Sequence, residues 1–204
     1  MDVFEAMETC RAMRYFKPDP VPAEMIDKLI YAATRAPSPG NSQGWDFVVI
    51  TDPAIKQQLQ QAIHTMLTTA MGPADALETA TAGMDPVQSR MLKGAYNLAS
   101  QLHEVPAIIL VCGRLVYPPH DPQEMFVWSG LYPAAQNILL AARALGLGSC
   151  FTTFQMFCEA DIRRIVGIPE DVRMAAFIPI GWPGKNFGPL ARKPVESFIH
   201  RNRW

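Results

Sequence analysis

The chain has 204 residues, of which 49% are hydrophobic and 18% charged, and its formal net charge is −1. This length suits one globular domain with a sizeable core, and the near-neutral charge argues against nucleic acid or an anionic membrane as a partner. The longest apolar run, AIILVC, is too short to cross a bilayer, and the acidic N-terminus is unlike a signal peptide. We therefore expect a cytoplasmic protein with no membrane partner.

The four cysteines and four histidines show no spacing typical of a metal site. There is no CxxC pair, and Cys112 lies in an apolar, strand-like run where cysteine acts as a small hydrophobic residue. The sequence therefore predicts buried free thiols in a reducing compartment rather than disulfides, and no bound metal.

The first half of the chain predicts helices around one buried strand. Residues 11–16 leave the first helix in extended form, and Pro22 opens the second helix at a position where proline is tolerated. Residues 65–94 have weak periodicity, which predicts broken helices. The expected elements are a helix at 2–10, a helix with the stripe Ile26, Leu29, Ile30 and Ala33, a strand at 45–51, and a helix from Pro53 with Ile55, Leu59 and Ile63 on one face.

The second half predicts two further buried strands and the strongest helix. Its apolar residues recur every three or four positions from Leu131 to Leu145, with Pro133 near the start or at a kink. The other expected elements are a helix at 95–104, a strand at 106–113 covered on both faces, a stiff loop at 117–122, a short strand at 149–153, a short helix at 159–166 and a strand at 174–181. Strands separated by helices indicate an α/β or α+β sheet domain.

The loop from Pro37 to Gln43 is the most informative segment. Pro37 stops the preceding helix, and Pro39 and Gly40 favour an open turn. Ser38, Asn41 and Gln43 then offer hydrogen-bonding side chains suited to a flat ligand with a polar edge. A loop of this composition can also be an ordinary connector, so the interpretation depends on other elements.

Two basic segments could meet a phosphate group. Arg11 and Arg14 follow the first helix, and an arginine presents a planar fork of donors that matches phosphate. A buried strand ending at Gly181 opens into a Gly/Pro turn that is followed by Arg192 and Lys193. From these residues alone, a pair of surface arginines is an equally good interpretation of Arg11 and Arg14. The Gly146-Leu147-Gly148 run follows a helix and lacks a third glycine, so it is not a dinucleotide fingerprint.

Five segments in order resemble the FMN-dependent nitroreductase superfamily: METCRAMRYFKPDPVP, AATRAPSPGNSQGWDFVVI, AAQNILLAARALGLGS, PIGWP and ARKPVESFIH. The resemblance implies one α+β domain over residues 1–204, a three-layer sandwich whose central mixed, mostly antiparallel sheet is flanked by helices. It also implies an intertwined homodimer with two FMN sites at its interface. Residues 63–102 would form a variable cap, and residues 189–204 a tail exchanged with the partner.

The resemblance also implies which residues bind the cofactor. Arg11 and Arg14, with Ala12 and Met13 between them, resemble the basic cluster at the FMN phosphate and pyrimidine edge. Pro37, Ser38 and Asn41 resemble the loop beside the flavin ring that is contributed across the dimer, and Gln43 is the related polar position after it. The remaining implied contacts are Thr152 and Thr153 near the ring, Gly181, and Arg192 at the phosphate. Many members have Arg-Arg-Ser where this chain has Cys10-Arg11-Ala12, so one phosphate donor and one hydroxyl are missing.

The activity implied is an FMN-dependent oxidoreductase that works in a ping-pong cycle. NADH or NADPH would reduce FMN, and a small acceptor such as a nitroaromatic, a quinone or an enone would then take the electrons. Because the cofactor carries the hydride chemistry, no catalytic side chain is predicted. Three other reactions remain open on the same fold: reductive dehalogenation, dehydrogenation and flavin cleavage. A flavin-binding store or sensor without turnover also remains open.

Overall fold

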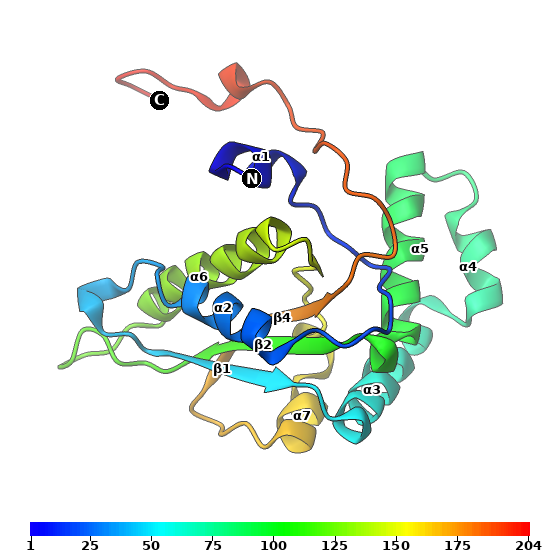
Figure 1. Cartoon of the computed structure of the whole chain (residues 1–204), viewed down its shortest axis with the longest axis horizontal. Coiled ribbons are helices and arrows are strands. Elements are labelled where there is room, and N and C mark those ends of the chain that lie inside the picture. The colour runs from blue at the N-terminus through cyan, green and yellow to red at the C-terminus, as the bar shows by residue number, and fades with distance from the viewer.

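The computed structural model describes the backbone of residues 1–204 and every side chain except that of residue 71. At its centre lies a four-stranded sheet in the order β1-β2-β4-β3, and each pairing is antiparallel (Figure 1). The strands are β1 (Trp45–Ile50), β2 (Ala107–Gly113), β3 (Gly148–Ser149) and β4 (Arg173–Gly181).

Helices cover both faces of this sheet. One core joins β2 and β4 to α2 and α6, and a second core joins the same strands to α3, α5 and α7. This arrangement confirms the expected α+β three-layer sandwich. The helices are α1 (Val3–Thr9), α2 (Ala23–Ala33), α3 (Pro53–Met71), α4 (Ala74–Thr81), α5 (Pro86–Ser100), α6 (Glu124–Ala144) and α7 (Gln155–Val166), with short 3-10 turns η1 (Pro39–Asn41), η2 (Leu102–Glu104) and η3 (Val195–Phe198).

Strand β2 is the centre of the protein, and all seven of its residues are buried. Ile108 and Leu110 belong to the core under α3 and α5, whereas Ile109 and Val111 belong to the core under α6. Successive side chains of a strand point to opposite faces, so a strand covered on both sides needs a continuous apolar run. The strand expected at 106–113 is therefore confirmed.

The middle of the chain is more regular than its sequence suggests. Helix α3 continues without a break to Met71, and Gly72 then ends it with a positive φ of 80°. Helix α5 begins at Pro86 rather than near 95, because the Asp85 carboxylate accepts hydrogen bonds from the backbone of Val87 and Gln88. The expected broken helices are thus α3, α4 and α5, separated by short turns.

Three other expectations on element limits are wrong. Helix α6 begins at Glu124 instead of near 131, so Pro133 takes the second of its two expected positions, inside the helix. The burial of Val127 and Gly130 against neighbouring elements outweighs the low helix propensity of proline. Helix α7 begins at Gln155 instead of 159, and the strand expected at 149–153 consists of β3 and an isolated bridge at Thr152.

The C-terminal tail does not pack into its own protomer. Residues 191–204 are all exposed, and Figure 1 shows the tail extending past α1, away from the sheet. The Leu190 amide donates a hydrogen bond to the Glu8 carbonyl, and this bond holds the start of the tail beside α1. No helix of the described residues combines the length and apolar character needed to cross a membrane.

Candidate functional site

The segment after α1 is fixed between two parts of the chain that are distant in sequence. The Met13 amide donates to the Ser149 carbonyl at 2.8 Å, which places the segment along the edge of β3. The Gly184 amide donates to the Tyr15 carbonyl, also at 2.8 Å, and so joins the segment to the turn that follows β4. The structure therefore brings the Gly/Pro turn after β4 to the segment with Arg11 and Arg14, but not the basic pair Arg192 and Lys193, which lies in the exposed tail.

Four cationic side chains line one cavity at this junction: Arg11, Arg14, Arg90 and Lys185. The cavity has a volume of about 230 Å³ and opens to solvent. None of the four forms an ion pair with a carboxylate in the described part of the chain. We call this cavity the cationic pocket. Unpaired positive charges facing one space favour the binding of an anion there.

Sequence reasoning found Arg11 and Arg14 but missed the other two cations. Lys185 directly follows the Gly/Pro turn after β4, so its position next to a singled-out motif was a usable signal. Its ammonium lies 3.7 Å from the centre of the Tyr15 ring, a cation–π contact. Arg90 lies in the segment with weak periodicity, where the sequence gives no sign of a site.

The loop from Pro37 to Gln43 has a tight backbone conformation with an internal hydrogen bond. The Ser38 hydroxyl oxygen accepts a hydrogen bond from the Gln43 amide at 2.7 Å and closes the loop. Gly40, Asn41 and Gln43 all have positive φ, which glycine and asparagine adopt most readily. Gly40 also lies against the Tyr117 ring, so no side chain fits at that position.

This loop and the cationic pocket lie at opposite ends of the sheet. The pocket borders Ser149, which pairs with Ile180, and Ile180 in turn pairs with Ala107 at the start of β2. The loop leads into Trp45, which pairs with Gly113 at the other end of β2. A seven-residue strand spans about 20 Å. One chain therefore does not bring the two predicted halves of the site together.

The other predicted residues differ in their surroundings. Thr152 is buried, and its hydroxyl donates to the Phe177 carbonyl at 2.7 Å, while Thr153 is exposed. Gly181 is buried against Phe16 and Pro106. Arg192 is exposed in the tail and donates to the Ala191 carbonyl. Gly181 and Arg192 are absent from the lining of the cationic pocket.

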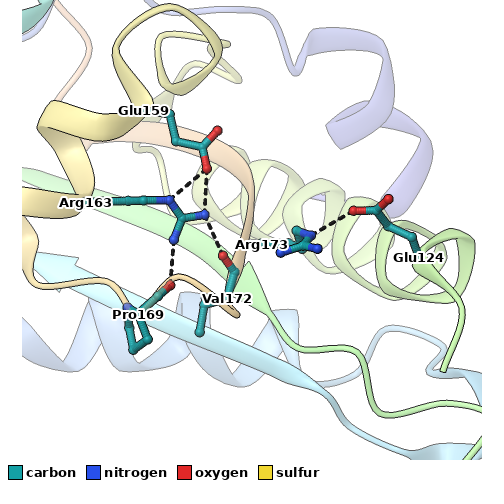
Figure 2. A network of polar contacts seen from close by, with 6 residues as sticks. All are labelled: Glu124, Glu159, Arg163, Pro169, Val172 and Arg173. Atoms are coloured by element: carbon teal, nitrogen blue, oxygen red, sulfur yellow. Dashed lines mark hydrogen bonds and ion pairs between the residues drawn. The ribbon is translucent and has the colours of Figure 1, made fainter.

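A second polar network fixes the end of the sheet near the loop (Figure 2). The Arg163 guanidinium donates to the carbonyls of Pro169 and Val172, at 2.6 and 2.7 Å, and to the Glu159 carboxylate. Arg173 at the start of β4 donates to Glu124 at the start of α6 at 2.7 Å. The contacts of Arg163 with Pro169 and Val172, and that of Arg173 with Glu124, each join two structural elements, whereas Glu159 and Arg163 both belong to α7. We therefore assign the network a structural role.

The buried cysteines are poorly suited to act as nucleophiles. Burial, together with the nearby Asp46 carboxylate, raises the pKa of Cys112 to about 12. Burial likewise raises the pKa of Cys150 and of Cys158 to about 11. Thiols with such pKa values stay protonated near neutral pH. All four cysteines are free, as expected, although Cys10 is only half-buried.

These features define an α+β protein with a polar loop at one end of its sheet and a pocket lined by cationic side chains at the other. The sequence model of the nitroreductase family matches residues 8–182. The chain therefore belongs to the nitroreductase family.

Individual relatives agree with this assignment. An NADH dehydrogenase from Thermus thermophilus is 29% identical over 195 residues, which cover 93% of this chain and 90% of the relative. A crystal structure of oxidized iodotyrosine deiodinase bound to FMN and 3-iodo-L-tyrosine superposes with a TM-score of 0.78 at 20% identity, covering all of both chains. A crystal structure of an FMN and NADPH-dependent nitroreductase from a Sphigopyxis strain superposes with a TM-score of 0.75 at 19% identity, again covering all of both chains. These two structures show that the fold is shared.

Proposed function

We propose that the protein is an FMN-dependent oxidoreductase that takes electrons from NADH or NADPH and passes them to a small aromatic or conjugated acceptor. The cationic pocket is the observation that carries this proposal. The names of the relatives add support, because they include an NADH dehydrogenase and an enzyme dependent on FMN and NADPH.

The pocket fits the phosphate end of FMN. A phosphate monoester is close to a dianion at neutral pH, and charge-assisted hydrogen bonds from arginine are about twice as strong as neutral ones. Arg11 and Arg14 present such donors with no competing carboxylate partner among the described residues. A volume of about 230 Å³ holds a phosphate and its linker but lies below the usual range for a whole ligand site.

The rest of the flavin needs a second surface, which we assign to a second copy of the chain. The loop with Pro37, Ser38 and Asn41 lies at the other end of the sheet, so a homodimer would place the partner's loop over the pocket. The exposed aromatic residues of the tail, such as Phe198 and Trp204, and the exposed Phe4 of α1 give apolar surface for such an interface. The tail would then be exchanged with the partner.

The bound flavin would supply the hydride chemistry, and the protein would position it. Arg14 would face the pyrimidine edge, where its fixed positive charge favours the more negative reduced form. Thr152 and Thr153 would lie near the ring, and Gln43 would complete the polar loop. We assign no proton-transferring side chain, and we place the acceptor beneath the cap formed by residues 63–102.

The first test is the colour and the reduction of the purified protein. We expect a yellow protein that releases close to one FMN per chain on denaturation. Anaerobic stopped-flow mixing with NADH, and separately with NADPH, should bleach the bound flavin within seconds and identify the preferred donor. A colourless protein that does not bind added FMN would rule out the proposal. Flavin that stays oxidised for many minutes would favour a store or sensor instead.

Dehalogenation is the alternative with specific support, because iodotyrosine deiodinase shares the fold over all of its chain. The described part of the cap, however, has no obvious cluster of charged residues for a zwitterionic substrate: Lys93 is paired with Glu78 at 2.7 Å, and Arg90 lines the cationic pocket. We therefore rank nitroaromatics, quinones and enones above an amino-acid substrate. Steady-state turnover of these acceptors beside 3-iodotyrosine discriminates between the two activities. Faster turnover of 3-iodotyrosine would reverse the ranking.

A further inference from the structure

Two of the four cations in the pocket come from elements to which neither the sequence motifs nor the family comparison gives a role. Arg90 belongs to α5 in the cap region, and Lys185 to the turn after β4. Their side chains line the same cavity as Arg11 and Arg14, although Arg90 lies 76 positions beyond Arg14 in the sequence. The fold thus gathers four positive charges from three separate segments.

Direct contacts hold α5 against the arginine segment. The Asn97 side chain donates to the Arg14 carbonyl at 3.0 Å. Gly94 lets the Arg14 side chain lie directly on the helix, because a Cβ atom at position 94 would come within 3.0 Å of the Arg14 Cδ atom. Arg90 lies one helical turn before Gly94, so the same contact brings its guanidinium to the pocket. The position of Arg90 therefore follows from packing and not from a flexible loop.

The charge balance of the pocket calls for an anion with more than one negative charge. Four cations repel one another, and no described carboxylate is paired with any of them. A phosphate monoester relieves this repulsion and offers three acceptor oxygens. In addition, Cys10 and Ala12 stand where the family resemblance implies an arginine and a hydroxyl, so donors from elsewhere are needed.

We propose that Arg90 and Lys185 are phosphate ligands that replace the missing donors and, with Arg11, hold the FMN phosphate. This inference rests on the proposed function, since it needs FMN as the ligand. It adds a consequence for the cap: α5 contributes directly to cofactor binding, so the cap is tied to the phosphate of the flavin. The same chemistry could serve the 2′-phosphate of NADPH, and the experiment separates the two sources.

The test compares FMN with riboflavin, which has the same ring but no phosphate. Dissociation constants are measured by flavin fluorescence on the full-length apoprotein for the wild type, Arg90→Gln and Lys185→Gln. We expect each variant to weaken FMN binding about tenfold, which is the worth of one charged hydrogen bond, and to leave riboflavin binding within about twofold. Lys93→Gln is the matched control, because it removes one charge from the same helix at a residue paired with Glu78. It should leave both constants unchanged.

The outcomes separate this inference from the proposed function. A wild type that binds neither flavin overturns both. A wild type that binds FMN, with variants that keep its affinity or that lose FMN and riboflavin equally, overturns only the role of Arg90 and Lys185. If the FMN-saturated variants instead lose preference for NADPH over NADH with unchanged FMN affinity, the pocket serves the nucleotide phosphate, and the assignment to FMN is wrong.

Discussion

Gly94 of α5 lies so close to Arg14 that a Cβ atom at position 94 would come within 3.0 Å of the arginine Cδ atom and 3.6 Å of its Cβ atom. Glycine inside a helix costs about 1 kcal/mol relative to alanine. A glycine here is therefore explained by the space that the Arg14 side chain occupies. This close approach connects the cap to the cationic pocket.

Gly94→Ala should raise the free energy of unfolding while weakening FMN binding. Alanine adds up to about 1 kcal/mol of helix propensity, and its methyl group displaces Arg14 by a few tenths of an ångström. Urea unfolding and a fluorescence titration with FMN measure the two effects. Gly130→Ala in α6 is the control for the unfolding measurement, because its nearest neighbour, Pro39, lies at an ordinary 3.7 Å. An unchanged FMN affinity in Gly94→Ala would contradict the role of this contact.

Arg14→Ala should weaken the binding of both FMN and riboflavin, whereas Arg90→Gln and Lys185→Gln should weaken the binding of FMN alone. If Arg14 contacts the pyrimidine edge, its loss removes a charged hydrogen bond of about 1.5–3 kcal/mol, or roughly ten- to a hundredfold in affinity. Titration with both flavins measures this effect, and Arg164→Ala on the exposed side of α7 is the control. Equal affinities in the wild type and Arg14→Ala would make Arg14 an ordinary surface arginine.

Deletion of residues 194–204 should remove dimer and bound FMN together. These residues are exposed in one protomer, with Phe198 64% and Trp204 101% accessible, so their loss removes little packing within that protomer. Sedimentation velocity and the flavin absorbance of the same sample report the two properties. A truncated monomer that still binds FMN tightly would refute the shared site. A truncated protein that remains dimeric would refute the role of the tail.

Arg163→Ala should cost about 2 kcal/mol of stability, and Arg164→Ala less than about 0.5 kcal/mol. The Arg163 side chain is 17% exposed and holds the Pro169 and Val172 carbonyls, whereas Arg164 is 70% exposed and pairs only with Asp161 (Figure 2 shows the Arg163 contacts). Denaturant unfolding of the two neighbouring variants makes the comparison direct. Equal losses of stability in Arg163→Ala and Arg164→Ala would show that the buried contacts of Arg163 contribute no more to stability than the exposed ion pair of Arg164.

Stability should fall as pH rises from about 9 to 11. Burial raises the pKa of Cys112 to about 12 and of Cys150 to about 11, so the folded protein keeps protons that the unfolded chain releases. Each such thiol lowers the free energy of unfolding by up to about 1.4 kcal/mol per pH unit in this range. Denaturant unfolding at a series of pH values measures this change. The free energy of unfolding should fall less steeply with pH in a Cys112→Ala/Cys150→Ala double variant than in the wild type. The lowered pKa of Lys56 acts in the opposite direction but equally in both proteins. An equal pH dependence of the free energy of unfolding in both proteins would contradict the raised pKa values of Cys112 and Cys150.

The sequence by itself determined the elements that depend on local pattern. The unbroken apolar run from Ala107 to Gly113 required a strand covered on both faces, and the segment order with its linked motifs identified the family and sandwich. Local chemistry also marked the loop at Pro37 and the arginines at 11 and 14, because proline, glycine and charge clusters act over a few residues.

Only the tertiary structure decided which of these regions meet. Helix α6 continues through Pro133 because packing of its first turns outweighs a local preference. Arg90 joins the pocket because Gly94 and Asn97 fix α5 on Arg14, which lies 80 and 83 positions earlier in the sequence, and no periodicity records such a contact. The loop and the pocket fall at opposite ends of β2 because strand pairing sets their separation. Contacts between distant segments depend on the packing of the whole chain, and for that reason local sequence patterns did not reveal them.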